Sequence, residues 1–131
     1  MGCGLVLGSS ALLSLLEGCV SVKVFNTSIQ NHLIRIPLSS LSVEEKMKII
    51  RTENLEYDIL LVRESDQSFR ALLMKCTHNE NAVFTDAKGL VCSLHGSTFD
   101  LNGEVTNGPA LKNLQRYMVS RDGQDLLIHL Q

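Results

Sequence analysis

Short hydrophobic runs separated by polar turns fill most of the chain after residue 20. Runs of this length, bounded by Gly, Asn, Asp and Ser, are typical of β-strands rather than helices. The expected strands cover residues 33–38, 47–51, 57–63, 69–75, 89–91, 99–101, 114–120 and 126–130. The pattern therefore predicts an all-β fold, either a sandwich or a small barrel.

Local signals between these runs predict how the strands connect. The polar residues 52–54 separate two runs that are expected to pair with each other, and Asn102-Gly103 is a strong tight-turn signal. Pro37 confines the first run to a sheet edge or to a strand end, because proline has no N–H to donate. The least defined stretch is 44–50, whose charges also allow a helix.

The N-terminus differs from the rest of the chain. Residues 1–16 carry no charge, and all twelve Lys and Arg residues lie at or after Lys23. The run is shorter than the ~20 apolar residues of a membrane span, but it fits the apolar part of an export signal. We therefore expect a leader over 1–19, a short linker over 20–31 and one domain over 32–131.

The end of this leader, Leu-Leu-Glu-Gly before Cys19, resembles a bacterial lipoprotein cleavage box. In such a box the cysteine becomes the new N-terminus and carries lipid, so Cys19 is a candidate lipidation site. An uncleaved anchor or a cysteine without a role are the alternatives. On this interpretation the protein is exported, to the periplasm or the outer face of the cytoplasmic membrane, and contacts the membrane through its leader or a lipid.

Composition excludes some partners. With 131 residues, a net charge of −2 and no Trp, the chain offers neither a basic surface nor stacking platforms for nucleic acid. The main candidate chemistry lies elsewhere. Cys76-Thr77-His78 is followed after thirteen residues by Cys92-Ser93-Leu94-His95. Two such pairs allow a chance arrangement, a structural zinc site with two Cys and two His, or a two-iron, two-sulfide cluster with two His on one iron.

The residues after the second pair favour the third interpretation. Residues 92–97 read Cys-Ser-Leu-His-Gly-Ser, followed by Phe99-Asp100, a glycine turn and Gly108-Pro109-Ala110. This series closely resembles the Rieske iron–sulfur proteins, over roughly residues 33–130. The resemblance implies stacked antiparallel sheets with a small cluster-binding subdomain at about 75–110. It also implies one [2Fe-2S] cluster per chain, with one iron held by Cys76 and Cys92 and the other by His78 and His95.

The resemblance also places five residues around the cluster: Gly96, Ser97, Phe99, Gly108 and Pro109. High-potential members of the family supply a Ser and a Tyr hydroxyl to the cluster, and they carry a disulfide between its loops. Ser97 matches the Ser, but Phe99 stands at the Tyr position. Asn81 and Leu94 stand where the disulfide cysteines would be. Hydrogen bonds to cluster sulfurs raise the potential, so we expect a potential in the middle or lower part of the Rieske range.

The function that follows is one-electron transfer, by a redox carrier or subunit rather than by a stand-alone enzyme. The leader favours an exported, membrane-associated component of a respiratory chain or oxidoreductase, whose partners are a quinol enzyme or a cytochrome. The alternative is a soluble Rieske ferredoxin that donates electrons to an oxygenase. A zinc-bound structural module is a third class, which lacks the colour and the reduced-state EPR spectrum of a Rieske cluster.

Overall fold

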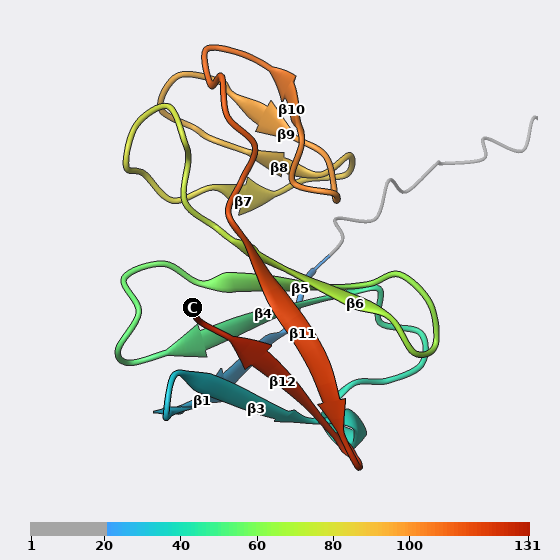
Figure 1. The fold of residues 1–131 in the computed structure, drawn as a ribbon. Coiled ribbons are helices and arrows are strands. Elements are labelled where there is room, and N and C mark those ends of the chain that lie inside the picture. Colours follow the sequence, from blue (N-terminus) through green and yellow to red (C-terminus); the bar gives the residue numbers. More distant parts are fainter. Residues whose placement is uncertain (1–20) are drawn as a thin grey trace, which may run out of the picture.

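The computed structural model describes residues 21–131, so the leader and Cys19 lie outside the described residues. The described chain forms a large sheet and a small sheet, which lie at opposite ends of the molecule (Figure 1). Besides its strands it contains one short 3-10 helix, Leu38–Ser40. The strands are β1 Val24–Thr27, β2 Ile29–Gln30, β3 Leu33–Pro37, β4 Met47–Thr52, β5 Ile59–Arg63, β6 Phe69–Leu73, β7 Phe84–Thr85, β8 Leu90–Val91, β9 Thr98–Phe99, β10 Val105–Asn107, β11 Arg116–Asp122 and β12 Asp125–His129.

The large sheet closes on itself. Its strand order is β1-β4-β5-β6-β11-β12-β3-β2, so the consecutive strands β1 and β2 stand at its two edges. β1 pairs with β4 in parallel, and β2 pairs with β3 in antiparallel fashion; only Ser28 separates β1 from β2. One short segment therefore joins both edges into a barrel. All other pairs in both sheets are antiparallel, which confirms the all-β prediction.

One sequence expectation needs correction. The stretch 20–31, expected as a linker, contains β1 and β2, because Phe25 and Ile29 pack against the barrel core. The strand expected over 47–51 is confirmed as β4, so the helix that the charges of 44–50 also allow does not form. Ile50 is buried there, opposite Ile59 of β5, and this pairing outweighs the helical preference of the flanking charges. Two other expectations are confirmed: β4 and β5 form a hairpin, and Pro37 lies at the end of β3.

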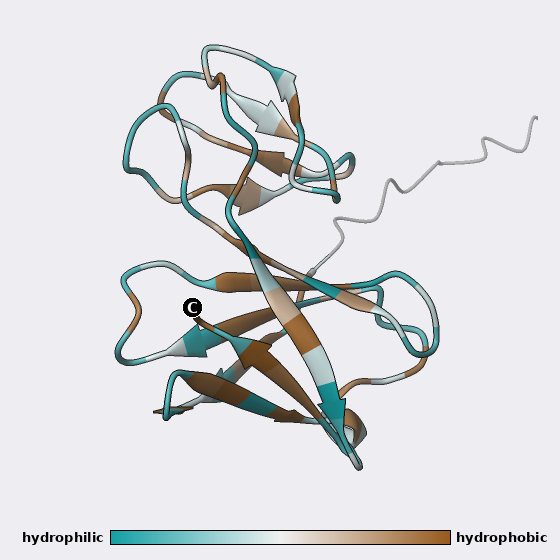
Figure 2. Ribbon diagram, viewed as in Figure 1, coloured by the Kyte–Doolittle hydropathy of each residue, from teal (hydrophilic) through white to brown (hydrophobic). Residues whose placement is uncertain are grey.

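The small sheet packs on the barrel through β5. Four of the five residues of β5 are buried, because both of its faces are covered. Ile59 and Leu61 point into the barrel core, whereas Leu60 and Val62 belong to a second core shared with the small sheet. The small sheet has the order β10-β9-β8-β7 and is inserted in the chain between β6 and β11. Figure 2 shows hydrophobic segments on the strands of both parts.

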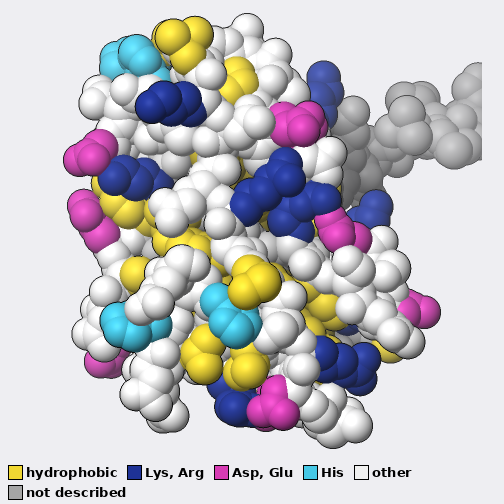
Figure 3. Space-filling model, viewed as in Figure 1, with side chains coloured by type: hydrophobic (Ala, Val, Ile, Leu, Met, Phe, Trp, Pro, Cys, Tyr) yellow, Lys and Arg dark blue, Asp and Glu magenta, His cyan; other side chains and the backbone are white. Residues whose placement is uncertain are grey.

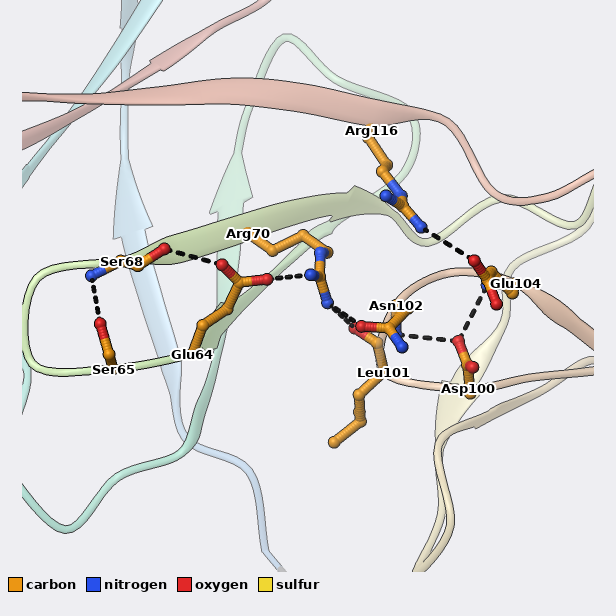
Figure 4. A network of polar contacts seen from close by, with 9 residues as sticks. All are labelled: Glu64, Ser65, Ser68, Arg70, Asp100, Leu101, Asn102, Glu104 and Arg116. Carbon is orange, nitrogen blue, oxygen red and sulfur yellow. Dashed lines mark hydrogen bonds and ion pairs between the residues drawn. The ribbon is translucent and has the colours of Figure 1, made fainter.

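A polar network also joins the two parts (Figure 4). Arg70 of β6 contacts the Glu64 carboxylate, and its Nη1 donates to the carbonyl oxygen of Leu101 at 3.2 Å and to the Asn102 side chain. The β9–β10 turn is therefore fixed to the barrel. Gly103 in this turn has φ +80°, and a Cβ there would lie 2.8 Å from Leu72 Cδ2. The predicted tight turn is confirmed, and its glycine is required by both backbone conformation and packing.

Within residues 21–131, no helix has the length and apolar character that a membrane crossing requires.

Candidate metal centre

Three loops gather at the end of the small sheet. We call them the first loop (76–81), the second loop (92–97) and the third loop (108–114). The first two are closed in the same way. The backbone N–H of Cys76 donates to the carbonyl of Asn81 at 2.7 Å, and the N–H of Cys92 donates to the carbonyl of Ser97 at 2.8 Å. Each of these two loops therefore begins at a cysteine whose backbone N–H is bound to the carbonyl of the loop's last residue.

The two predicted Cys-His pairs are brought together by these loops. Cys76 and Cys92 are 2% and 1% exposed, both are free, and both belong to the buried core shared with the small sheet. His78 and His95 are exposed, and their ring centroids lie 5.1 Å apart with an angle of 81° between the ring planes. Sulfur donors thus lie inside and nitrogen donors at the surface. We call the exposed surface of His78 and His95 the tip.

The surroundings of Cys76 favour its thiolate. Burial acts to raise the pKa of this thiol, but hydrogen bonds from the backbone of Asn79 and His78, and contacts with the side chains of Cys92 and Ser97, act against it. The net effect is a pKa below the ordinary thiol value. The thiolate is the form of cysteine that binds iron, so the environment suits a metal ligand.

The donor set fits a two-iron, two-sulfide cluster. Such a cluster takes two protein ligands at each iron, and the Rieske type takes two Cys at one iron and two His at the other. The four side chains at the loops supply these donors. In the described part of the chain, no three His, Cys, Asp or Glu side chains are arranged to hold one metal ion together.

The third loop is fixed to the other two. The buried Ser97 Oγ accepts a hydrogen bond from the Ala110 N–H at 3.0 Å, and Thr77 Oγ1 donates to the carbonyl of Lys112. Gly108 and Pro109, joined by a cis peptide bond, are exposed. Of the other residues expected around the site, Gly96 takes φ +77° in the second loop and Phe99 is buried in β9.

Other contacts support the first loop, at whose end Asn81 stands in place of a disulfide cysteine. Tyr57 Oη donates to the carbonyl of Glu80 at 2.7 Å, and Lys75 Nζ lies 2.9 Å from Glu80 Oε1. Leu94, at the other disulfide position, is 53% exposed. Sequence reasoning missed Tyr57 and Lys112. Neither stands in a motif, and their contacts with the first loop depend on the tertiary fold.

Comparisons with known proteins place this geometry in a family. The family model of the Rieske [2Fe-2S] domain matches residues 36–118. The large oxygenase component of the naphthalene 1,2-dioxygenase system of Pseudomonas fluorescens is 43% identical over 61 residues, 44% of this chain and 14% of that protein. The corresponding component of the 2,4-dinitrotoluene dioxygenase system of Burkholderia sp. (strain RASC) is 34% identical over 61 residues, with the same coverage. This chain thus matches only 14% of the length of these curated relatives.

Two solved structures share the fold. The plasma membrane Rieske protein of the cyanobacterium Synechocystis PCC 6803 superposes with a TM-score of 0.53 and 26% identity, covering 63% of this chain and 85% of that chain. The ferredoxin of carbazole 1,9a-dioxygenase from Nocardioides aromaticivorans IC177 gives a TM-score of 0.53 and 24% identity, covering 76% and 98%.

The family match includes all three loops, and the two structural matches cover 63% and 76% of this chain. The family predicted from residues 92–110 is therefore confirmed. The chain belongs to the Rieske [2Fe-2S] domain family, whose members bind a [2Fe-2S] cluster and transfer electrons through it.

Proposed function

We propose that Cys76 and Cys92 hold one iron of the cluster, that His78 and His95 hold the other, and that the chain carries single electrons between protein partners. One observation carries this proposal: the same two loops hold two free cysteines of one buried core and two exposed imidazoles whose centroids are 5.1 Å apart. The two kinds of ligand have different roles. The cysteines anchor the group away from water, and the histidines keep the other side within reach of a partner.

A cluster held by these four residues would supply one-electron transfer at the site. The two neutral imidazoles replace two negative thiolates, which makes the site less anionic than an all-cysteine site and electron acceptance easier. Ser97 supplies a hydroxyl among the three loops, while the ring of Phe99 adds no donor. This combination supports a potential in the middle or lower part of the Rieske range.

Ligand substitutions test the assignment. We expect Cys76→Ser and His78→Ser in the full chain to lose iron, acid-labile sulfide and the reduced-state EPR signal. His129→Ser is the matched control, because His129 lies in β12 and contacts Ser120 at 2.7 Å. It should retain all three. A wild-type protein without bound iron and sulfide contradicts the proposal, as does a His78→Ser variant that keeps the full wild-type signal.

We further propose that the carrier is exported and associated with a membrane, and that it passes electrons between a quinol enzyme or another oxidoreductase and a cytochrome. The uncharged residues 1–16 and the box before Cys19 support this setting. The similarity to a cyanobacterial plasma membrane Rieske protein agrees with it.

Metabolic labelling with a fatty acid tests the setting in a bacterial host that expresses the full chain. Labelled protein is expected in the membrane fraction. Cys19→Ala should remove the label, and Cys3→Ala, the matched control in the same leader, should keep it. Unlabelled protein in the cytoplasmic fraction contradicts the proposal.

A soluble ferredoxin that donates electrons to an oxygenase is the second candidate. The identity of up to 43% with oxygenase components favours it, as does the absence of cysteines at Asn81 and Leu94. The two candidates predict different acceptors. Faster oxidation of the reduced chain by a cytochrome than by a Rieske oxygenase supports the respiratory role, and the opposite order supports the ferredoxin role.

A further inference from the structure

A hollow of about 260 Å³ lies next to the tip, with walls from the first loop and from the end of the third loop. Its charged walls are Lys75, Glu80 and Lys112. Lys75 is paired with Glu80 at 2.9 Å. Lys112 has no carboxylate oxygen within 4 Å among residues 21–131. The hollow therefore carries one uncompensated positive charge.

The fold fixes this charge close to the tip. Thr77, which stands between Cys76 and His78, donates its side-chain hydrogen bond to the backbone carbonyl of Lys112. Further along, Leu73 N–H donates to the Gln115 carbonyl at 2.9 Å, which ties the following residues to β6. The backbone of Lys112 is thus held against the residue next to a proposed iron ligand, while the residue as a whole is exposed.

An exposed apolar residue precedes this lysine in the chain. Leu111 is 95% exposed, whereas its neighbour Ala110 is buried against Ser97. A single exposed leucine is ordinary on a protein surface. Here, however, it stands beside an unpaired lysine at the exposed end of a redox site. Figure 3 shows histidine, hydrophobic and Lys or Arg side chains together at the end of the molecule that carries the small sheet.

We propose that Leu111 and Lys112 form a docking edge for a redox protein with an acidic, partly apolar face. Lys112 pairs with a partner carboxylate at the hollow, and Leu111 packs against an apolar side chain beside it. The charge favours an acidic partner over a basic one, because like charges placed opposite each other disfavour the complex. This inference rests on the proposed electron-transfer function and adds the partner's chemistry to it.

Two redox proteins of opposite charge test the edge: an acidic plastocyanin and a basic cytochrome c. In each reaction one electron leaves the reduced chain and reduces Cu(II) to Cu(I) or haem Fe(III) to Fe(II). Stopped-flow rates are compared for wild type, Lys112→Glu, Leu111→Ser and Lys88→Glu. Lys88 is the matched control, an exposed lysine in the β7–β8 turn whose Nζ also makes no ion pair within 4 Å among the described residues.

We expect Lys112→Glu to slow plastocyanin reduction by about threefold to tenfold at low ionic strength, and the effect to shrink as salt is added. Cytochrome c reduction should become faster. Leu111→Ser should slow plastocyanin reduction at all salt concentrations, and Lys88→Glu should change either rate by less than Lys112→Glu does. Cadmium-substituted plastocyanin, which carries no electron, should bind Lys112→Glu more weakly than wild type in calorimetry.

Equal effects of Lys112→Glu and Lys88→Glu overturn the docking edge. A second outcome also overturns it, in favour of a lipid surface. In that outcome the wild-type chain binds vesicles containing phosphatidylglycerol through Leu111 and Lys112, and substitution of these residues leaves the rates of protein reduction unchanged. The EPR spectrum of each variant is recorded first. A missing signal in wild type contradicts the proposed function itself, whereas intact signals with unchanged rates contradict only the docking edge.

Discussion

Ser97 Oγ accepts a 3.0 Å hydrogen bond from the backbone N–H of Ala110, and the two residues are 0% and 2% exposed. The carbonyl of Ser97 also closes the second loop on Cys92, and hydrogen bonding by its side chain helps to lower the pKa of the Cys76 thiol in the first loop. A single residue therefore connects all three loops of the metal centre. This use of its polar groups explains why a serine is completely buried there.

Replacing this serine tests the connection. We expect Ser97→Ala to lower the free energy of unfolding by about 1–3 kcal/mol, because the Ala110 N–H is left buried without a partner. The reduction potential should also fall, since a hydroxyl donor near the cluster sulfurs stabilises the more negative reduced form. Urea denaturation and protein-film voltammetry measure the two effects. Ser93→Ala, an exposed change in the same loop, should leave both values unchanged.

At Phe99 a hydroxyl can be added instead of removed. It is 1% exposed in β9, where high-potential relatives of this family place a Tyr hydroxyl. We expect Phe99→Tyr to raise the reduction potential, because the added hydroxyl gives the reduced form one more donor. The EPR signal should persist, since the change adds a single oxygen atom to the side chain. An unchanged potential in voltammetry, with the signal intact, means that the position does not face the cluster.

The metal centre was readable from the sequence because its information is local. Each Cys-His pair lies within four consecutive residues, and each loop closes on a residue five positions after its cysteine. The β4–β5 hairpin and the Asn102-Gly103 turn are also short-range features, and both are observed. Features of this kind can be predicted from the sequence because they depend on neighbouring residues and little on contacts with distant parts of the chain.

The errors arose where distant contacts decide. β1 and β2 are short strands. They pair with β4 and β3 because the barrel closes there, and the sequence pattern of residues 24–30 does not by itself predict this pairing. Distant contacts also decide between the two interpretations of 44–50: Ile50 lies in the barrel core, so the expected strand forms there and the alternative helix does not. The position of Lys112 beside the first loop depends on a contact with Thr77, 35 residues earlier in the chain.

Glu45 is expected to make stability depend on pH. Lys48 Nζ lies 2.8 Å from one of its oxygens and Lys23 Nζ 3.1 Å from the other. Hydrogen bonds from Lys48 first, and then from Lys23, lower the pKa of this carboxyl from 4.5 to about 2. A lowered folded-state pKa stabilises the fold above the unfolded value, and this contribution disappears as the pH falls from about 4.5 towards 2.

Glu45→Gln should therefore be less stable than wild type at neutral pH and show a shallower loss of stability across that acidic range. Denaturant titrations at a series of pH values measure the difference. Glu53→Gln is the control, because Glu53 is exposed and has no ion pair in the described part of the chain. Parallel pH profiles for wild type and Glu45→Gln would contradict the assigned ion pairs.

The attachment of the small sheet to the barrel can be tested at Arg70, which contacts Glu64, the Leu101 carbonyl and Asn102. Arg116 approaches the same turn from β11, but its Nη2 lies 3.9 Å from Glu104 Oε1 and both side chains are largely exposed. Figure 4 shows Arg70 next to Asn102 and Leu101, and Arg116 next to Glu104. Their unequal contacts make Arg116→Gln a matched control for Arg70→Gln.

We expect Arg70→Gln to lower the free energy of unfolding by about 1–2 kcal/mol, because the Glu64 carboxylate and the Leu101 carbonyl lose a charged donor at partly buried positions. Arg116→Gln should cost less than about 0.5 kcal/mol, since an exposed pair at long distance contributes little. Hydrogen exchange should be faster in Arg70→Gln at the backbone amides of Asn102 and Glu104. Both amides belong to the turn, where they donate hydrogen bonds to Asp100 Oδ1 at 2.8 and 2.9 Å. Equal destabilisation by both substitutions would show that packing of Gly103 against Leu72, rather than Arg70, attaches the turn to the barrel.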